Sequence, residues 1–165
     1  MWFLTQEGVD RYDGKYIKHY NFSDDSIKLD SRIALNWLYM DSGNILWVIG
    51  QKGRIFRYDS QHDKFKLAYI HPELIRNKPQ AFLNYGYLDK NDRIWLCYKD
   101  SITWYDIRTG TTLHMPTPVN GEITAIEQTD SNHFFIGTGN GLFHAGIEKG
   151  KLNIMPDKMV EGIGT

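Results

Sequence analysis

Short apolar runs, separated by clusters of Gly, Asn, Asp and Ser, follow one another along the whole chain. Two of these runs, residues 45–49 and 94–98, are apolar at successive positions instead of alternate ones. This pattern indicates strands that are covered on both faces. No segment keeps the roughly 3.6-residue period of an amphipathic helix, which argues against a helical solenoid. The chain is therefore predicted to be all-β, with short strands joined by tight turns.

A pattern of residue types is repeated four times along the sequence. Each copy begins with an aromatic residue, and these lead aromatics, at positions 2, 47, 95 and 135, are 45, 48 and 40 residues apart. Ten or eleven residues later the first three copies have a Tyr-Asp pair, where the fourth has Ala145 and Gly146. A repeat of this length is typical of β-propeller blades. A β-sandwich would explain the short strands but not the repeat.

The sequence also repeats upstream and downstream of the lead aromatics, in segments that are typical of further strands. Similar segments begin 13 residues upstream, at 34–41, 82–89 and 122–129, and β-rich runs follow downstream at 15–20, 64–70, 111–115 and 151–155. The sequence therefore predicts about four four-stranded antiparallel propeller blades. Their expected borders are 1–32, 33–80, 81–120 and 121–158, within one propeller segment over 1–165, and a further blade begins at 159–165.

The two ends of this repeat pattern are incomplete. The first copy lacks an upstream strand, and Val160 and Ile163 are spaced like Ile123 and Ile126. We therefore expect a fragment of a larger propeller, whose last strand closes onto the first blade or whose terminal edges stay open. Of these, the open form is favoured, with two chains associating through their edges.

Charge and composition exclude several classes of partner. The net charge of −1 leaves no basic surface for nucleic acid or for an anionic membrane. No apolar stretch is long enough to cross a bilayer, and the first residues lack the features of a signal peptide. The single cysteine, Cys97, cannot form an intrachain disulfide and is expected to pack as a small hydrophobic residue.

Candidate catalytic and metal-binding motifs are weak. The Gly-rich segment 137–141 is not followed by a helix that could bind a phosphate, so a hairpin turn is favoured. The segment 89–92 (Asp-Lys-Asn-Asp) lacks the Gly and Glu of a calcium loop and is expected to be a solvated turn. The six histidines do not have metal-ligand spacing. The chain is therefore predicted to have no catalytic residue, metal or cofactor of its own.

Three segments carry a resemblance to a known family: 46–50 (Leu-Trp-Val-Ile-Gly), 57–59 (Arg-Tyr-Asp) and 135–142 (Phe-Ile-Gly-Thr-Gly-Asn-Gly-Leu). They resemble the repeat of two-component regulator propellers. The third copy departs from it, because residues 98–101 (Tyr-Lys-Asp-Ser) replace the Gly-Leu turn. The resemblance implies seven-bladed propellers in the extracytoplasmic, periplasmic sensor region of hybrid histidine kinases of Bacteroides-type bacteria, which respond to products of polysaccharide breakdown.

In propellers, the loops between blades and the turns between second and third strands meet on one face, where ligands bind. Six side chains in such segments can donate to sugar hydroxyls or carboxylates: Arg32, Lys52, His71, Arg76, Asn77 and Lys99. The sequence thus favours a ligand-sensing propeller segment with an oligosaccharide as its possible ligand. A protein-interaction scaffold is the alternative, and a propeller lyase or hydrolase is a more distant one.

Overall fold

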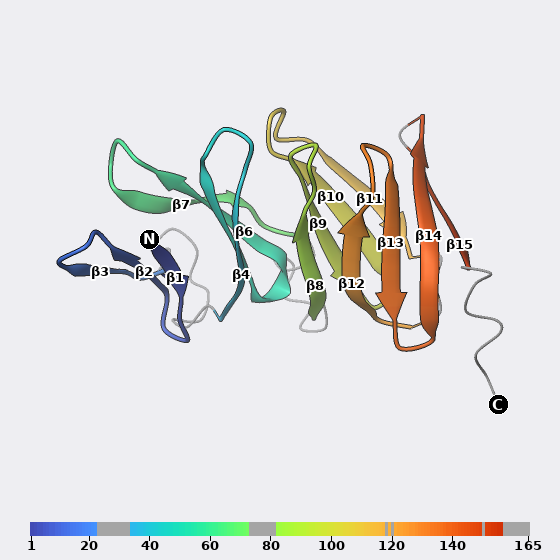
Figure 1. The fold of residues 1–165 in the computed structure, drawn as a ribbon, viewed down its shortest axis with the longest axis horizontal. Helices are drawn as coiled ribbons and strands as arrows, with labels where there is room; N and C mark the ends of the chain where they lie inside the picture. The colour runs from blue at the N-terminus through green and yellow to red at the C-terminus, as the bar shows by residue number, and fades with distance from the viewer. Residues whose placement is uncertain (23–33, 73–81, 118, 120, 150, 157–165) are drawn as a thin grey trace. The chain divides into compact units, whose positions relative to one another are not determined.

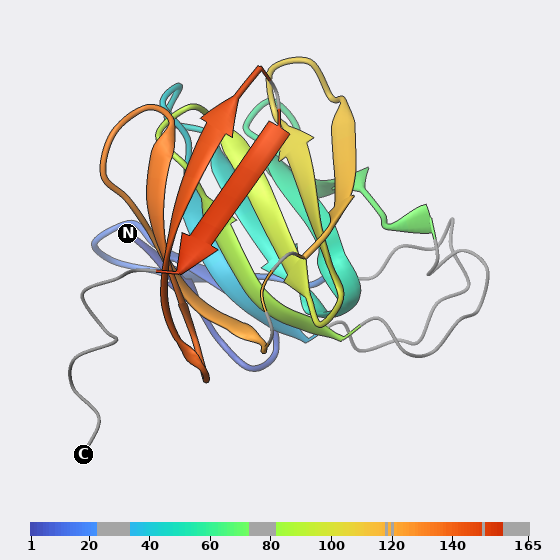
Figure 2. The same cartoon turned by 90° about the vertical axis from the view of Figure 1, so that its right-hand side faces the viewer.

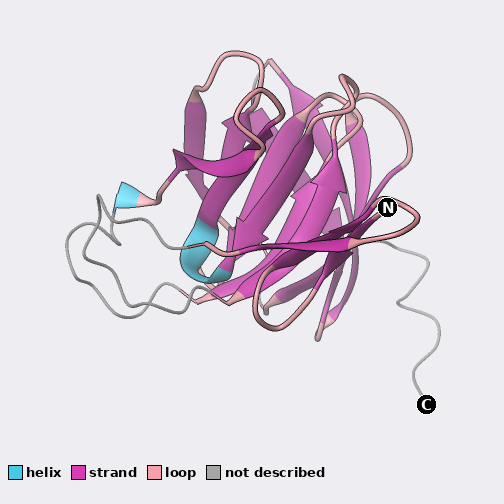
Figure 3. Ribbon diagram, turned by 90° about the vertical axis from the view of Figure 1, so that its left-hand side faces the viewer, coloured by secondary structure: helices cyan, strands magenta, loops and turns pink. Residues whose placement is uncertain are grey.

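Almost every element that the structure describes is a β-strand (Figure 3). The computed structural model describes residues 1–22, 34–72, 82–117, 119, 121–149 and 151–156. In these ranges the strands form one three-stranded and three four-stranded antiparallel sheets, each with its strands in chain order (Figure 1). This architecture confirms the predicted all-β fold of propeller blades, although the first blade has three strands.

The four sheets are named blades 1 to 4 in chain order. Blade 1 contains β1 (Trp2–Leu4), β2 (Val9–Tyr12) and β3 (Ile17–Tyr20). Blade 2 contains β4 (Leu35–Met40), β5 (Leu46–Gly50), the 3-10 turn η1 (Gln51–Gly53), β6 (Arg54–Asp59) and β7 (Lys64–Tyr69). Blade 3 contains β8 (Leu83–Leu88), β9 (Arg93–Tyr98), β10 (Ser101–Asp106) and β11 (Thr112–Pro116). Blade 4 contains β12 (Ile123–Gln128), β13 (His133–Thr138), β14 (Gly141–Glu148) and β15 (Lys151–Pro156).

The chain divides into two compact units, residues 1–82 and 83–165. Unit 1 contains blades 1 and 2, and unit 2 contains blades 3 and 4. The strands of each sheet fall inside one predicted repeat, but the borders of the repeats and the single segment over 1–165 stay predictions. Val160 and Ile163, on which the expected further blade depends, lie outside the described residues.

The sequence repeat corresponds to a repeat of backbone geometry. In each four-stranded blade the register of the first strand shifts near its start, between Leu35 and Trp37, Leu83 and Tyr85, or Ile123 and Ala125. The starts of these bulges are 48 and 40 residues apart, the same spacing as the lead aromatics of these blades. A bulge at a recurring position bends each first strand in the same way.

The Tyr-Asp pairs of the repeat shape the turn between the last two strands of a blade. The carboxylates of Asp13, Asp59 and Asp106 each accept hydrogen bonds from the two backbone amides that lie two and three residues further on, at 2.8–3.4 Å. An aspartate that binds its own backbone in this way favours a turn. Blade 4 has Gly146 at this position in place of an aspartate.

Each blade has two faces, which we name by the lead aromatic residue. The aromatic face carries Trp2, Trp47, Trp95 or Phe135, and the back face is the opposite one. In unit 2, the aromatic face of blade 3 packs on the back face of blade 4: the Trp95 ring lies 4.7 Å from the Phe134 ring, between centroids. Cys97 is fully buried in the same cluster, as predicted from its apolar neighbours.

Unit 1 has the same packing pattern. The aromatic face of blade 1, with Trp2 and the fully buried Val9, packs on the back face of blade 2, with Val48 and Phe56. Trp2 also lies edge-on to Tyr58, with 4.8 Å between ring centroids. In both units, therefore, the aromatic face of one blade covers the back face of the next.

Burial of the second strands agrees with their apolar sequence. All five residues of β5 are buried, and so are residues 94–98 of β9. Trp47 and Trp95 are 3% and 0% exposed at equivalent positions of blades 2 and 3, which follow one another in the sequence. The prediction that these strands are covered on both faces is confirmed.

Candidate functional site

The predicted ligand-binding residues are only partly within the described residues. Arg32, Arg76 and Asn77 lie outside them, and their role stays a prediction. Lys52 lies in η1, between the second and third strands of blade 2, with a left-handed φ of 66°. Lys99 is exposed and directly follows β9. His71 lies two residues after the end of β7 and is 6% exposed, so most of its side chain is covered.

In unit 2 the structure brings two of the predicted turns to one connection between blades. The amide of Thr117 donates to the carbonyl oxygen of Asp100 at 3.0 Å, beside Lys99. Further along the same connection, Gly121 adopts a φ of 113°, and a Cβ there would lie 3.0 Å from the Asn140 Nδ2 atom. The Lys99–Asp100 turn and the Asn140 turn thus border one connection. This end of unit 2 offers an ammonium and an amide, groups that can bind hydroxyl or carboxylate oxygens.

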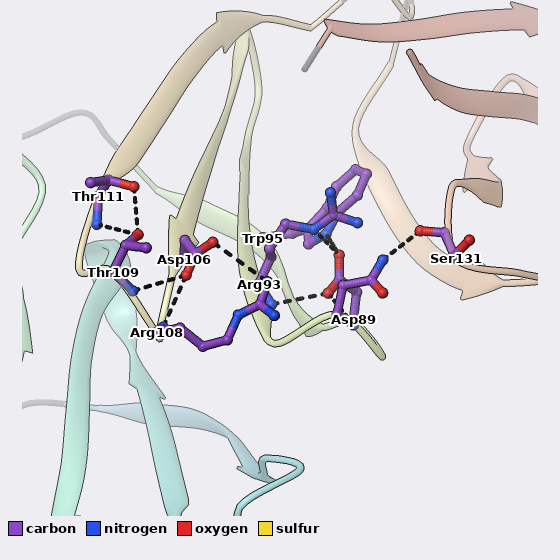
Figure 4. A network of polar contacts seen from close by, with 9 residues as sticks. Asp89, Arg93, Trp95, Asp106, Arg108, Thr109, Thr111 and Ser131 are labelled. Atoms are coloured by element: carbon purple, nitrogen blue, oxygen red, sulfur yellow. Dashed lines mark hydrogen bonds and ion pairs between the residues drawn. The ribbon is translucent and has the colours of Figure 1, made fainter. Parts of the chain in front are cut away.

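A buried carboxylate that was not predicted from the sequence lies in the hairpin between the first and second strands of blade 3. Asp89 follows β8 and is 3% exposed, so the expected solvated turn at 89–92 is wrong for this residue. Its Oδ1 atom accepts from the backbone amides of Asn91 and Arg93, both at 2.9 Å. Its Oδ2 atom accepts from Arg93 Nε at 2.7 Å and from Trp95 Nε1 at 2.9 Å (Figure 4). Four donors therefore balance the cost of burying this charge.

Blade 2 repeats this arrangement, and blade 4 does not. Asp41 accepts from Trp47 Nε1 at 2.8 Å, six residues further on, as Asp89 does from Trp95. In blade 4 the corresponding residues are Thr129 and Phe135, so the carboxylate and the indole donor are absent together. This paired change, visible in the sequence, is the signal that could have identified Asp41 and Asp89. The contact fastens the lead tryptophan to the turn that precedes its strand.

Polar contacts also join blades 3 and 4 at this end of unit 2. The amide of Lys90 donates to the side-chain oxygen of Gln128 at 2.6 Å, and Gln128 is 1% exposed. The side-chain amide of Asn91 donates to the carbonyl oxygen of Ser131 (Figure 4). These contacts are structural, because they fix one blade against the next beside the Asp89 carboxylate.

A second polar cluster, in unit 1, joins blades 1 and 2. The Asp63 carboxylate accepts from Arg11 Nη1 at 3.0 Å, from Tyr20 at 2.6 Å, and from Lys18 and Tyr58. The Arg11 guanidinium also lies over the Trp2 ring, 5.4 Å from its centroid. Sequence reasoning could not find this cluster, because its members are up to 52 residues apart and occupy unrelated positions of the repeat.

The titration of this cluster follows from its contacts. The hydrogen bond from Lys18 and those from Tyr20 and Tyr58 lower the pKa of Asp63. Desolvation and the hydrogen bond to Asp63 raise the pKa of Tyr20. The aspartate therefore stays ionised and the phenol stays protonated at neutral pH, which makes the cluster a clamp between the blades.

Acidification is expected to weaken this clamp. Because the pKa of Asp63 is lowered from its ordinary value of 3.8, its charged form stabilises the folded chain above that pH. This contribution is lost progressively as the pH falls below 3.8. An Asp63→Asn variant should melt below the wild type at neutral pH, and the difference should shrink in acid. A difference in melting temperature that is constant across the pH range would show that the charge of Asp63 does not stabilise the contact between the blades. Asparagine suits this test because it tolerates the left-handed φ of 48° at residue 63.

The single cysteine of the chain is held in an unreactive form. The Cys97 thiol is completely buried, and burial raises its pKa, which disfavours the reactive thiolate. Within the described ranges, no group of three or more His, Cys, Asp and Glu residues is placed to hold a metal ion. None of the helices described is long and apolar enough to cross a membrane.

The fold is shared with solved propeller proteins. The extracellular domain of BT3049 from B. thetaiotaomicron, described as a hybrid two-component system, matches 93% of this chain with a TM-score of 0.66 and 20% identity. The extracellular domain of BT4673 from the same organism, described as a one-component system, matches 96% with a TM-score of 0.66 and 16% identity. Virginiamycin B lyase from Staphylococcus aureus matches 95% with a TM-score of 0.68 and 14% identity. No protein-family model matches the chain, and neither does any curated protein.

The matched structures are longer than this chain. It spans 23% and 21% of the two extracellular domains and 52% of the lyase. The likeness therefore establishes the propeller-blade fold, and it extends along almost the whole chain.

Proposed function

We propose that this chain is a ligand-sensing propeller segment of the extracytoplasmic, periplasmic part of a hybrid two-component sensor. The observation that carries the proposal is the match of 93% of the chain to the extracellular domain of such a system. The repeat of residues 46–50, 57–59 and 135–142 supports it independently, because it resembles the two-component regulator propellers. The sensor's kinase activity would belong to other parts of the protein.

The proposed ligand is an oligosaccharide released by polysaccharide breakdown. The turns between second and third strands are its proposed contacts, considered one unit at a time: Lys52 in unit 1 and Lys99 in unit 2 can each donate to hydroxyl or carboxylate oxygens. Arg32, His71, Arg76 and Asn77, which belong to the segments between blades in the sequence, stay predicted donors. A charged amine at either turn favours oligosaccharides that carry uronic acids over neutral ones.

Calorimetric titration of the chain with neutral and uronic-acid oligosaccharides tests this proposal. We expect heat of binding with the acidic set. Lys99→Ala should weaken binding about tenfold or more, since a hydrogen bond to a charged group contributes about 1.5–3 kcal/mol. Lys52→Gly, which suits the left-handed φ of this residue, should weaken binding as well. Lys151→Ala, an exposed lysine at the start of β15, is the control and should bind normally. Equal binding by all three variants would overturn the proposed site.

A lyase function is the second candidate, because virginiamycin B lyase shares the fold over 95% of this chain. We infer that the chain has no such activity of its own, since the only cysteine is buried and the described residues contain no metal-binding group. Incubation with a streptogramin substrate separates the two functions. Cleavage that disappears when a single histidine is replaced would favour the lyase. We also propose that the chain self-associates through the strand edges of its blades, because unpaired edges can pair with another chain. Light scattering over a range of concentrations tests this, and a monomer at every concentration would contradict it.

A further inference from the structure

The bulged residue of each first strand is polar. In the four-stranded blades, the register shift leaves one residue of the first strand without a partner in the second strand: Asn36 in β4, Asn84 in β8 and Thr124 in β12. Each of the three lies between two hydrophobic residues in the sequence. A β-bulge re-aims the side chain that it carries and is common beside functional sites. Because asparagine is depleted in strands, its recurrence here indicates a role other than strand formation.

In blade 3 the bulged residue lies at the same end of the sheet as the proposed ligand contact. Leu83, which precedes Asn84, pairs with Tyr98. Lys99 follows Tyr98 directly. An ammonium group only donates hydrogen bonds, whereas a carboxamide both donates and accepts them. This end of blade 3 therefore offers a cation for a carboxylate and an amide for a hydroxyl group, the two polar groups of a sugar acid.

The Asn84 side chain has hydrogen-bonding capacity that the described residues do not use. Its Nδ2 atom is buried and has no hydrogen-bond partner among them. The residue as a whole is only partly buried, so part of it reaches the surface. Asparagines that support a local bend hydrogen-bond to the nearby backbone, and the Nδ2 atom of Asn84 does not. A covered donor without an acceptor costs free energy, which a ligand oxygen would recover.

Blade 4 places a second polar bulge on the neighbouring strand of unit 2. The first strands β8 and β12 lie side by side, as Figure 1 and Figure 2 both show. Thr124, the bulged residue of β12, is exposed. Its hydroxyl donates to the carbonyl oxygen of Gly137 at 3.3 Å, and the hydroxyl oxygen can still accept. Unit 2 thus offers an amide on β8 and an accepting oxygen on β12.

Blade 2, in unit 1, independently repeats the arrangement of blade 3. Leu35, which precedes Asn36, pairs with Gly50. Lys52 lies two residues beyond Gly50, and Asn36 is exposed. An asparagine in the bulge of the first strand and a lysine in the turn after the second strand therefore occur together in two blades.

We propose that Asn84 is a ligand-binding residue and that, with Lys99, it recognises one uronic acid unit of an oligosaccharide. The lysine binds the carboxylate, and the carboxamide binds a ring hydroxyl. Asn36 and Lys52 form the corresponding pair in blade 2. The inference rests on the proposed function and deepens it, because it assigns the two groups to different parts of the sugar. A site that hydrogen-bonds a hydroxyl discriminates against ligands that lack it.

Calorimetric titration with a uronic-acid oligosaccharide at low and at high salt tests this assignment. Asn84→Ala should weaken binding about three- to tenfold relative to the wild type at both salt concentrations, since a neutral hydrogen bond is lost. The loss caused by Lys99→Ala should shrink at high salt, because salt screens exposed charges. Asn153→Ala, at an exposed asparagine in β15, is the matched control and should bind like the wild type. Asn84→Ala should also melt like the wild type, because the amide nitrogen that it removes has no partner in the described part of the chain.

The other outcomes separate this inference from the proposed function. If Lys99→Ala weakens binding and Asn84→Ala does not, Asn84 is not a ligand contact, and the proposed function stands. If Asn84→Ala unfolds or melts below the wild type, its amide supports the fold and the inference is wrong. If the wild type binds no uronic-acid oligosaccharide, both the proposed ligand and this inference are wrong.

Discussion

Replacing Trp95 with alanine is expected to lower the free energy of unfolding by about 3–5 kcal/mol, because a large buried aromatic side chain is lost and a cavity remains. Trp95 is completely buried and contacts the Trp104 and Phe134 rings, at 4.9 and 4.7 Å between centroids. It therefore connects the sheets of blades 3 and 4. Urea titration measures the change as a shift in midpoint at constant slope. Where the variant is unfolded before urea is added, its far-UV circular dichroism shows the loss directly.

Phe135→Ala is the matched control for this prediction. Phe135 occupies the equivalent lead position in blade 4, but its side chain lies over an open hollow and is only partly buried. Its replacement should cost about 1 kcal/mol or less, as for residues outside a packed core. If Trp95→Ala cost no more than Phe135→Ala, the assignment of Trp95 to the interblade core would be wrong.

Much of the fold was predictable because the blade repeat leaves a local pattern in the sequence. The lead aromatics, the successive apolar residues of β5 and β9 and the turn residues all act within one blade. The predicted strand 34–41 corresponds to β4 (Leu35–Met40), and the predicted run 111–115 to β11 (Thr112–Pro116). The left-handed residues Asn44 and Asp92, with φ of 60° and 61°, occupy equivalent turns of blades 2 and 3. Residues of this type tolerate such a conformation, so the turns could be placed from composition.

The polar cluster of unit 1 was less predictable, because it depends on contacts that the repeat does not encode. Arg11 and Asp63 meet only after two blades have packed together, and nothing in the local sequence of either residue indicates the other. Asp89 was misinterpreted for a different reason: an Asp-Lys-Asn-Asp turn has the composition of an exposed loop. Its burial depends on the indole of Trp95, which is six residues away. The ligand-binding role of Lys52 and Lys99 stays a prediction, since position on a turn does not identify a ligand.

The buried Asp89 carboxylate explains why the repeat couples an aspartate to a tryptophan. The indole Nε1 of Trp95 would be buried without an acceptor if the carboxylate were absent. The carboxylate in turn needs several donors to offset the loss of water. Neither residue is well accommodated in the blade core without the other, so we expect a blade that lacks one of them to lack both. Blade 4, with Thr129 and Phe135, contains the exchanged pair.

Asp89→Ala is accordingly expected to destabilise unit 2 by about 3–5 kcal/mol, because it leaves the Arg93 guanidinium and the Trp95 indole without their buried acceptor. Combining Asp89→Thr with Trp95→Phe copies the pair found in blade 4. The double variant should be more stable than the sum of the single changes predicts, by about 1–3 kcal/mol, since the two residues are in direct contact. Urea titration of the four proteins in this cycle measures that coupling. Glu148→Ala, at an exposed position at the end of β14 in blade 4, serves as the control and should have little effect. Strictly additive losses would show that the indole and the carboxylate stabilise the blade independently of each other.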